Sequence, residues 1–352
     1  MRKLADCLLL TLTFLVLLVH GFIPSFAQTA VSFVPQTPHA GGIGSIAFSP
    51  DGSLLLTVGE DNSIRLWDVA EQSLLRVFVG HAGIVRNAVF SPDGKEIMSQ
   101  AQNEDYSIRF WDVETGRQLA AVYDRDSYAQ IAPWSAYLAG SNSYVSLFGS
   151  HATIRSRGSD SIRHKLFVAQ GDSTSAAVAQ SGMQLLVADE TEGVGVWDTR
   201  SGKKVGSFGR LSGIPFAASI SPNGKKFLIG DNQGATFEVD IKSKKKRLVS
   251  NQRNPVYFSK YSHDGTKIIT GDAEGNVQML SAPTLKTLKR YSGLIGTMAL
   301  SPQANILAVG SPEGIKVVDL ESGDMNSPEF RRHPRVRFSA ASRTRRATAS
   351  RS

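Results

Sequence analysis

The sequence has one cysteine in 352 residues, Cys7, and this residue lies in an apolar stretch near the N-terminus. Because we expect that stretch to be removed on export, the mature chain would have no thiol to form a disulfide, bind zinc or attack a substrate. Cys7 also comes too early to be a lipoprotein attachment site. Cysteine chemistry is therefore excluded from the expected functions.

The N-terminus has the layout of a secretory signal peptide. Met1-Arg2-Lys3 is basic, Cys7 to Val19 is apolar, and Ser25-Phe26-Ala27 places small residues before a cleavage point. We predict that residues 1–27 are removed, and that the product is secreted or periplasmic without a stable membrane span. The alternative is an uncleaved anchor, because the apolar stretch extends to Ile23, although a span needs about 20 apolar residues.

The chain also lacks the motifs that carry catalysis or bind a cofactor. No Gly-rich phosphate loop, Gly-x-Ser-x-Gly elbow, His-Glu-x-x-His helix or Asp-x-Asp-x-Asp-Gly calcium loop occurs. His151, Asp160 and His164 are close in sequence, but their spacing matches no metal-binding pattern. We predict a protein that is not an enzyme and uses no cofactor or metal.

The net charge of +8 is distributed unevenly along the chain. Residues 327–352 contain eight arginines and one glutamate, whereas residues 28–326 are neutral overall, which gives no support to specific nucleic-acid binding. The Arg/Ser-rich tail, residues 326–352, is expected to be disordered. It either binds an anionic surface or has no role. The stretch KSKKKR at 242–247 is expected at a sheet edge, where lysines prevent pairing with other chains.

Helical periodicity is scarce, whereas glycine occurs 32 times and short apolar runs end at turn residues, as in all-β proteins. "FSPDG" occurs at 48–52 and at 90–94, and its glycine recurs at intervals of 41 to 44 residues when one interval of 88 is counted as two. These glycines are Gly52, Gly94, Gly182, Gly224 and Gly265. A Trp-Asp pair or a degenerate form of it follows in step, at Trp67-Asp68, Trp111-Asp112, Trp197-Asp198, Val239-Asp240, Leu280-Ser281 and Val318-Asp319. The period indicates a repeat array.

The first two units, "HAGGIGSIAFSPDG…EDNSIRLWDV" and "GHAGIVRNAVFSPDG…EDYSIRFWDV", resemble WD repeats, and the resemblance covers about residues 31–325. It implies an all-β fold, a single seven-bladed β-propeller of four-stranded antiparallel blades. It also implies that the strand at 29–34 completes the last blade. With the signal peptide, the chain is identified as an exported WD-repeat protein of bacterial type. The expected blades are 39–80, 81–124, a degenerate 125–169, 170–210, 211–250, 251–291 and 292–325.

Two sets of polar residues recur at blade spacing. The resemblance implies that each set forms a buried structural hydrogen-bond network that ends at the Trp indole. The sets are His39, Thr57, Asp61 and Trp67, and His81, Ser99, Asp105 and Trp111. The alternative is a His-hydroxyl-carboxylate catalytic set, but a hydrolase needs only one such set, so the recurrence favours a structural role.

We expect a monomeric, non-catalytic scaffold that binds a protein or peptide partner on the propeller face. The resemblance places the start of each innermost strand around the mouth of the central channel, and several residues there are large. The candidate contact residues are Ile84, Arg86, Ile214, Phe216, Pro255, Tyr257 and Leu294, with Gly42, Gly44 and Gly296 at matching positions. Phe216 and Tyr257 could instead pack between blades. The alternative functions are an enzyme or small-ligand propeller that uses the central channel, and the sensor half of a larger effector protein.

Overall fold

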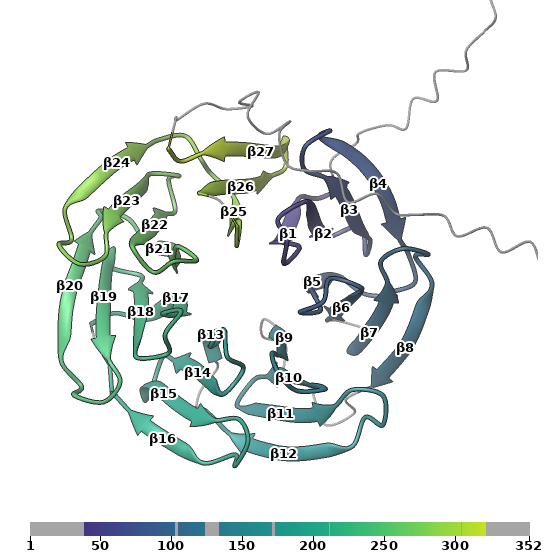
Figure 1. The fold of residues 1–352 in the computed structure, drawn as a ribbon, viewed down its shortest axis with the longest axis horizontal. Helices are drawn as coiled ribbons and strands as arrows, with labels where there is room; N and C mark the ends of the chain where they lie inside the picture. The colour runs from purple at the N-terminus through teal and green to yellow at the C-terminus, as the bar shows by residue number, and fades with distance from the viewer. Residues whose placement is uncertain are drawn as a thin grey trace, which may run out of the picture. The chain divides into compact units, whose positions relative to one another are not determined.

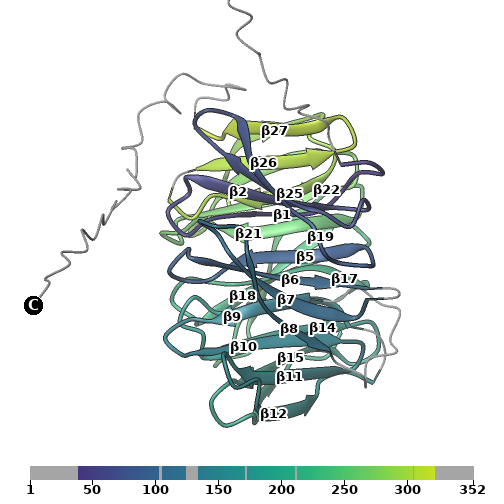
Figure 2. The ribbon, with the colours of Figure 1, turned by 90° about the vertical axis from the view of Figure 1, so that its right-hand side faces the viewer.

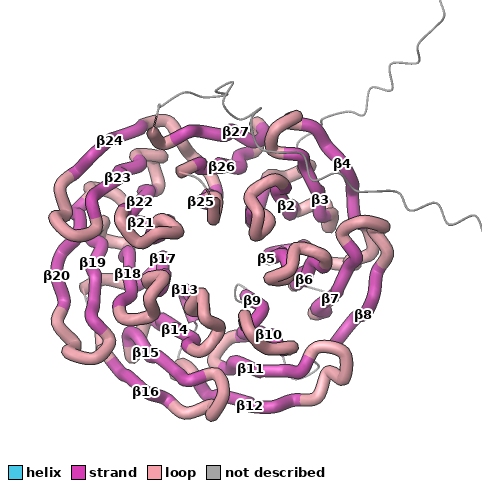
Figure 3. Tube along the Cα trace, in the orientation of Figure 1, coloured by secondary structure: helices cyan, strands magenta, loops and turns pink. Residues whose placement is uncertain are grey.

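The computed structural model describes residues 39–102, 105–123, 134–170, 173–210, 212–303 and 305–321. Every regular element in this part of the chain is a β-strand (Figure 3). The predicted signal peptide, the strand at 29–34 and the Arg/Ser-rich tail lie outside the described residues.

The strands form seven antiparallel sheets, which are the blades of a ring (Figure 1). The first blade comprises β1 (Ile43–Phe48), β2 (Leu54–Gly59), β3 (Ile64–Asp68) and β4 (Ser73–Phe78), and the second comprises β5 (Val85–Phe90), β6 (Glu96–Ala101), β7 (Ser107–Asp112) and β8 (Gln118–Tyr123). The third comprises β9 (Trp134–Leu138), β10 (Ser143–Phe148), β11 (His151–Ser156) and β12 (Ile162–Phe167), and the fourth comprises β13 (Ser173–Val178), β14 (Gln184–Asp189), β15 (Gly193–Asp198) and β16 (Lys204–Ser207). The fifth comprises β17 (Pro215–Ile220), β18 (Lys226–Asp231), β19 (Ala235–Asp240) and β20 (Lys246–Asn251), the sixth β21 (Val256–Tyr261), β22 (Lys267–Asp272), β23 (Val277–Ser281) and β24 (Thr287–Tyr291), and the seventh β25 (Thr297–Leu300), β26 (Ile306–Ser311) and β27 (Gly314–Asp319).

The predicted all-β, seven-bladed propeller is confirmed. Within each blade the strands pair in chain order, from the innermost strand at the ring axis to the outermost strand at the rim (Figure 1). The innermost strands run roughly along the axis of the ring (Figure 2). Six blades have four strands, and the seventh has three among the described residues, so the predicted contribution of the strand at 29–34 stays a prediction.

The repeated Ser-Pro-Asp-Gly stretches form the turns between the first and second strands. In the first blade the Leu54 amide donates to Ser49 Oγ at 2.9 Å, and Asp51 accepts the Ser53 amide at 3.1 Å. Gly52 has a φ of 74°, in the left-handed region where a Cβ would be strained. The turn is therefore held by its own residues and needs no ligand.

The hydrophobic core lies between adjacent blades, because each second strand is buried on both faces. Ring closure follows the same rule: Ile46 and Leu55 of the first blade share one cluster with Ile306 and Ala308 of the seventh. The degenerate third unit forms a complete blade, and Val145 packs with residues of the fourth. Lost signature residues thus do not prevent a blade from forming.

Side chains on the outer strands β4, β12 and β20 contact the turn before the outer strand of the next blade. Arg76 Nη2 donates to the Glu114 carbonyl at 2.7 Å, and Arg247 Nη1 donates to the Pro283 carbonyl at 3.2 Å. At the matching position of the third blade, His164 Nε2 lies 2.8 Å from the Arg200 carbonyl. The turns before β8, β16 and β24 therefore lie against the preceding blade.

Candidate interaction site at the axial mouth

The first blade contains the hydrogen-bond network expected from its sequence. His39 Nδ1 lies 2.8 Å from Asp61 Oδ1, and His39 Nε2 lies 2.9 Å from Thr57 Oγ1. Trp67 Nε1 donates to the same Thr57 oxygen at 2.9 Å. Since the carboxylate can only accept, Nδ1 carries the proton and Nε2 accepts from the Thr57 hydroxyl. Burial lowers the pKa of His39, although Asp61 opposes this effect.

The second blade repeats this arrangement with a serine in place of threonine. His81 Nδ1 lies 2.7 Å from Asp105 Oδ2, His81 Nε2 lies 2.7 Å from Ser99 Oγ, and Trp111 Nε1 donates to Ser99 at 2.8 Å. Burial lowers the pKa of His81. Desolvation raises the pKa of Asp105, but hydrogen bonds from His81 and Ser107 outweigh this effect and hold it well below the usual range. Both networks lie inside the blades, where they fix the turn after the second strand.

Three later blades hold the same turn with an aspartate that the sequence interpretation did not identify. Asp231 Oδ1 accepts the Ala235 amide at 2.8 Å, and Asp272 Oδ1 accepts the Asn276 amide at 2.8 Å. In the fourth blade, Asp189 accepts the Thr191 amide at 2.7 Å. The signal was present in the sequence, because an aspartate ends the second strand in each of these blades and a glycine follows three or four residues later.

A β-bulge near the start of the innermost strand shapes the end of the ring axis where these strands begin, which we call the axial mouth. The pairing register shifts around Gly44, Arg86, Phe216 and Tyr257. A bulge leaves one residue unpaired and changes the direction of its side chain. The structure therefore gives these four residues a shared position, one in each of the first, second, fifth and sixth blades, that a regular strand would not provide.

Two of the predicted contact residues lie against one another at this mouth. The rings of Phe216 and Tyr257 are stacked, with centroids 5.1 Å apart and an angle of 5° between their planes. Tyr257 remains 58% exposed, and Phe216 is half-buried. The pair joins the fifth and sixth blades and presents aromatic surface to solvent.

The other candidate contact residues differ in exposure. Ile84, Ile214 and Pro255 are half-buried. Arg86 is half-buried as well, and its Nε donates to the side-chain oxygen of Gln102 at 2.7 Å.

The prediction of Leu294 as a contact residue was wrong. Leu294 is only 2% exposed and packs in the core between the sixth and seventh blades, whereas the next residue, Ile295, is 61% exposed. The physical reason is the loop before β25, where Gly293 and Gly296 have positive φ and the Leu294 amide donates to the Gly275 carbonyl at 3.1 Å. This loop directs Leu294 inward and Ile295 outward.

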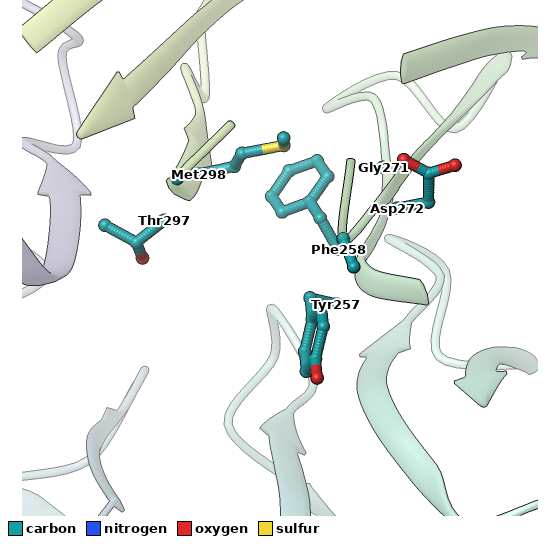
Figure 4. A pocket seen from close by; sticks show the side chains of 8 residues that line it. Tyr257, Phe258, Gly271, Asp272, Thr297 and Met298 are labelled. Atoms are coloured by element: carbon teal, nitrogen blue, oxygen red, sulfur yellow. The ribbon is translucent and has the colours of Figure 1, made fainter. Parts of the chain in front are cut away.

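A cavity of about 440 Å³ opens beside Tyr257, between the sixth and seventh blades. In Figure 4, the Phe258 ring and the Met298 side chain point toward one another from neighbouring blades, with Tyr257 below them. Gly271 and Gly296 leave space in the lining because they have no side chain, and Asp272 and Thr297 supply polar atoms. The sequence interpretation identified only Tyr257 and Gly296 of this set, because the cavity depends on residues that neighbouring blades bring together.

Comparison with known proteins supports the resemblance of the first two units to WD repeats. The pattern of the family described as "WD domain, G-beta repeat" matches residues 32–68 and 72–112, which correspond to the first two units. The chain is a seven-bladed β-propeller whose first two units match the WD-repeat pattern. It is 22% identical over 258 residues to Autophagy-related protein 16 of Arabidopsis thaliana, covering 69% of this chain and 48% of that protein.

Two further relatives of this propeller come from vertebrates. It is 25% identical over 268 residues to human Pre-mRNA-processing factor 17, covering 72% of this chain and 45% of the relative. It is 24% identical over 295 residues to the U3 small nucleolar RNA-associated protein 15 homolog of Xenopus laevis, covering 82% and 48%. The chain thus spans about half the length of these curated relatives.

Neither a metal cluster nor a spanning helix occurs in the described part of the propeller. No group of three His, Cys, Asp or Glu side chains there could hold a metal ion. His151 lies edge-on to the Phe167 ring, with centroids 5.4 Å apart, and His164 contacts the Arg200 carbonyl. No helix in the same residues is long and apolar enough to cross a membrane.

Proposed function

We propose that the protein is a non-catalytic scaffold that binds a protein or peptide partner at the axial mouth. The observation that carries this proposal is the stacked Phe216–Tyr257 pair beside the cavity of about 440 Å³. Exposed aromatic residues next to a pocket are typical of the anchors that supply most of the binding energy at interfaces. Ile295 extends the apolar surface on the seventh blade.

The histidine networks support a binding function over catalysis. The side chains of His39 and His81 have almost no exposed surface, and their hydrogen-bonding nitrogens are engaged inside the blades. A general base must come within hydrogen-bond reach of its substrate. These networks therefore serve the fold in our proposal.

A peptide-display selection against the full chain tests this function. We expect selected peptides to lose about tenfold or more in affinity for Tyr257→Ala, because truncation of an aromatic anchor at a hot spot costs about 2 kcal/mol or more. Tyr123→Ala is the matched control, since Tyr123 has the same 58% exposure on the outer strand β8. Equal affinity for both variants would place the docking site away from the mouth.

We also propose that the protein is exported, with removal of residues 1–27 to give a secreted or periplasmic form. The basic start, the apolar run and the Ser25-Phe26-Ala27 site support this proposal. The relatives described above are from a plant, human and frog, so the bacterial origin rests on no comparison. The intact mass of the protein recovered outside the cytoplasm tests export, and a chain that still begins at Met1 would contradict it.

A further inference from the structure

The basic stretch at 242–247 is only partly explained by the protection of a sheet edge. The strand β20 begins at Lys246, so Lys242, Lys244 and Lys245 lie on the turn before it, and all three are exposed. Arg247, on the strand, is engaged by the buried Glu238 carboxylate and by the Pro283 carbonyl. Among the described residues, no carboxylate forms an ion pair with the side chain of Lys242, Lys244 or Lys245.

The matching turns of the two neighbouring blades also carry exposed cations. Lys244 Nζ lies 5.9 Å from the centroid of the Phe208 ring, next to the outer strand of the fourth blade. On the other side, Arg247 contacts the turn before β24. We call the exposed cations on these three adjacent turns and on β20 the lysine-rich rim, which comprises Arg200, Lys203, Lys242, Lys244, Lys245, Lys246 and Lys286.

The lysine-rich rim has little negative charge of its own. Within the described residues, no carboxylate lies within ion-pair distance of Lys203, Lys242 or Lys245. Asp198 and Asp240 begin two of the turns, but their carboxylates accept the amides and hydroxyls of serines in the same turns. The other six cations of the rim, without Lys246, therefore outnumber these two engaged carboxylates, and the surface attracts anions.

Exposed aliphatic side chains accompany these cations on the same three blades. Val205, Leu248 and Leu288 are each about half exposed, and they lie on the outer strands β16, β20 and β24. In contrast, Phe208, which follows β16, and Tyr291, which ends β24, are partly buried. The surface thus combines ammonium groups with aliphatic chains and has no exposed aromatic ring among its described residues.

The combination of lysine ammonium groups with exposed aliphatic side chains favours one class of anionic partner over the others. Single-stranded nucleic acid is bound through exposed aromatic rings as well as charge, and carboxylates are best matched by arginine forks. Lysines beside exposed aliphatic chains suit a bilayer, where the ammonium groups meet phosphates and the aliphatic chains enter the interface. We propose that the lysine-rich rim binds the surface of a membrane rich in anionic lipid, independently of the axial mouth.

Vesicle co-sedimentation of the full chain tests this proposal. We expect binding to phosphatidylcholine vesicles that contain phosphatidylserine, little binding to pure phosphatidylcholine, and loss of binding as salt is raised. The charge-reversed variant Lys242→Glu, Lys244→Glu, Lys245→Glu should bind at least about tenfold more weakly. The matched control reverses three exposed cations elsewhere, with Lys95→Glu, Arg117→Glu and Lys316→Glu, and should keep nearly all of its binding.

A second variant leaves the charge unchanged. Val205→Ser with Leu248→Ser removes aliphatic surface and should weaken vesicle binding several-fold at constant melting temperature, so the test survives if the charge-reversed variant fails to fold. Equal binding to both vesicle types would overturn the proposal, and so would an equal loss in the control. Binding to a single-stranded oligonucleotide or polyglutamate but not to vesicles would also overturn it, because the rim would then be a site for a soluble polyanion.

Discussion

At the scale of single residues, the paired histidine networks show how buried polar groups fix a turn. Trp111 is buried, and its indole donates to Ser99, which also contacts His81. We predict that Trp111→Phe lowers the free energy of unfolding by about 1 to 3 kcal/mol, because it leaves a buried hydroxyl with one partner fewer. Urea unfolding measures this change. Trp134→Phe is the control, because the half-buried Trp134 side chain forms no hydrogen bond with the described residues. An equal loss of stability in this control would show that the smaller ring, and not the lost hydrogen bond, causes the effect.

The same residues make stability depend on pH. Burial lowers the pKa of His39 and His81 below that of an unfolded histidine, so on acidification the unfolded chain takes up protons first. The contribution of the two neutral histidines to the free energy of unfolding is therefore fully present above the ordinary histidine pKa of about 6.5. It falls as the pH drops below that value, by at most about 1.4 kcal/mol per pH unit for each histidine.

We predict that urea unfolding between about pH 7.5 and 5.5 shows this loss, in a range where ordinary carboxylates do not titrate. His81→Gln should reduce the slope, whereas His151→Gln should leave it unchanged because His151 is exposed on β11. A slope that survives replacement of both His39 and His81 would exclude these networks as its source.

At the scale of elements, the sequence predicted the repeat, the blades and their turns, because each rests on local signals such as Ser-Pro-Asp-Gly. It failed where the outcome depends on contacts between blades. Leu294 faces inward because of two glycines and a contact with the preceding blade. The cavity beside Tyr257 likewise needs Met298 and Gly271 from adjacent sheets. Neither contact leaves a periodic pattern in the chain.

The seventh blade gives the element-scale prediction. It has three strands among the described residues, β25 to β27, and the apolar run at 29–34 is a candidate for the fourth. Deletion of residues 28–36 should lower the melting temperature strongly, because the ring would lose the strand that joins its two ends. Truncation after Ser327 is the control and should have little effect. An unchanged melting curve after the first deletion would show that the strand at 29–34 has no part in closure.

At the scale of the whole molecule, ring closure leaves the outer strands as the exposed sheet edges. Most of them carry lysine or arginine, which discourages pairing with other chains. The first two blades are exceptions. The outer strand β8 contains no lysine or arginine. On β4, Leu75 and Val77 are exposed while the Arg76 guanidinium is held by carbonyls of the next blade. Of these two edges, β4 exposes aliphatic side chains at Leu75 and Val77, which are followed by the exposed Val79.

We predict that the propeller is nevertheless a monomer at micromolar concentration. A stable interface buries about 800 Å² on each partner, whereas the apolar edge of β4 offers only Leu75, Val77 and the adjacent Val79. Light scattering of the full chain should give the mass of one copy, and Val77→Lys should not change it. A dimer that Val77→Lys converts to monomer would contradict the prediction and would show that two β4 edges pair, because a lysine at that position adds like charges across the antiparallel contact.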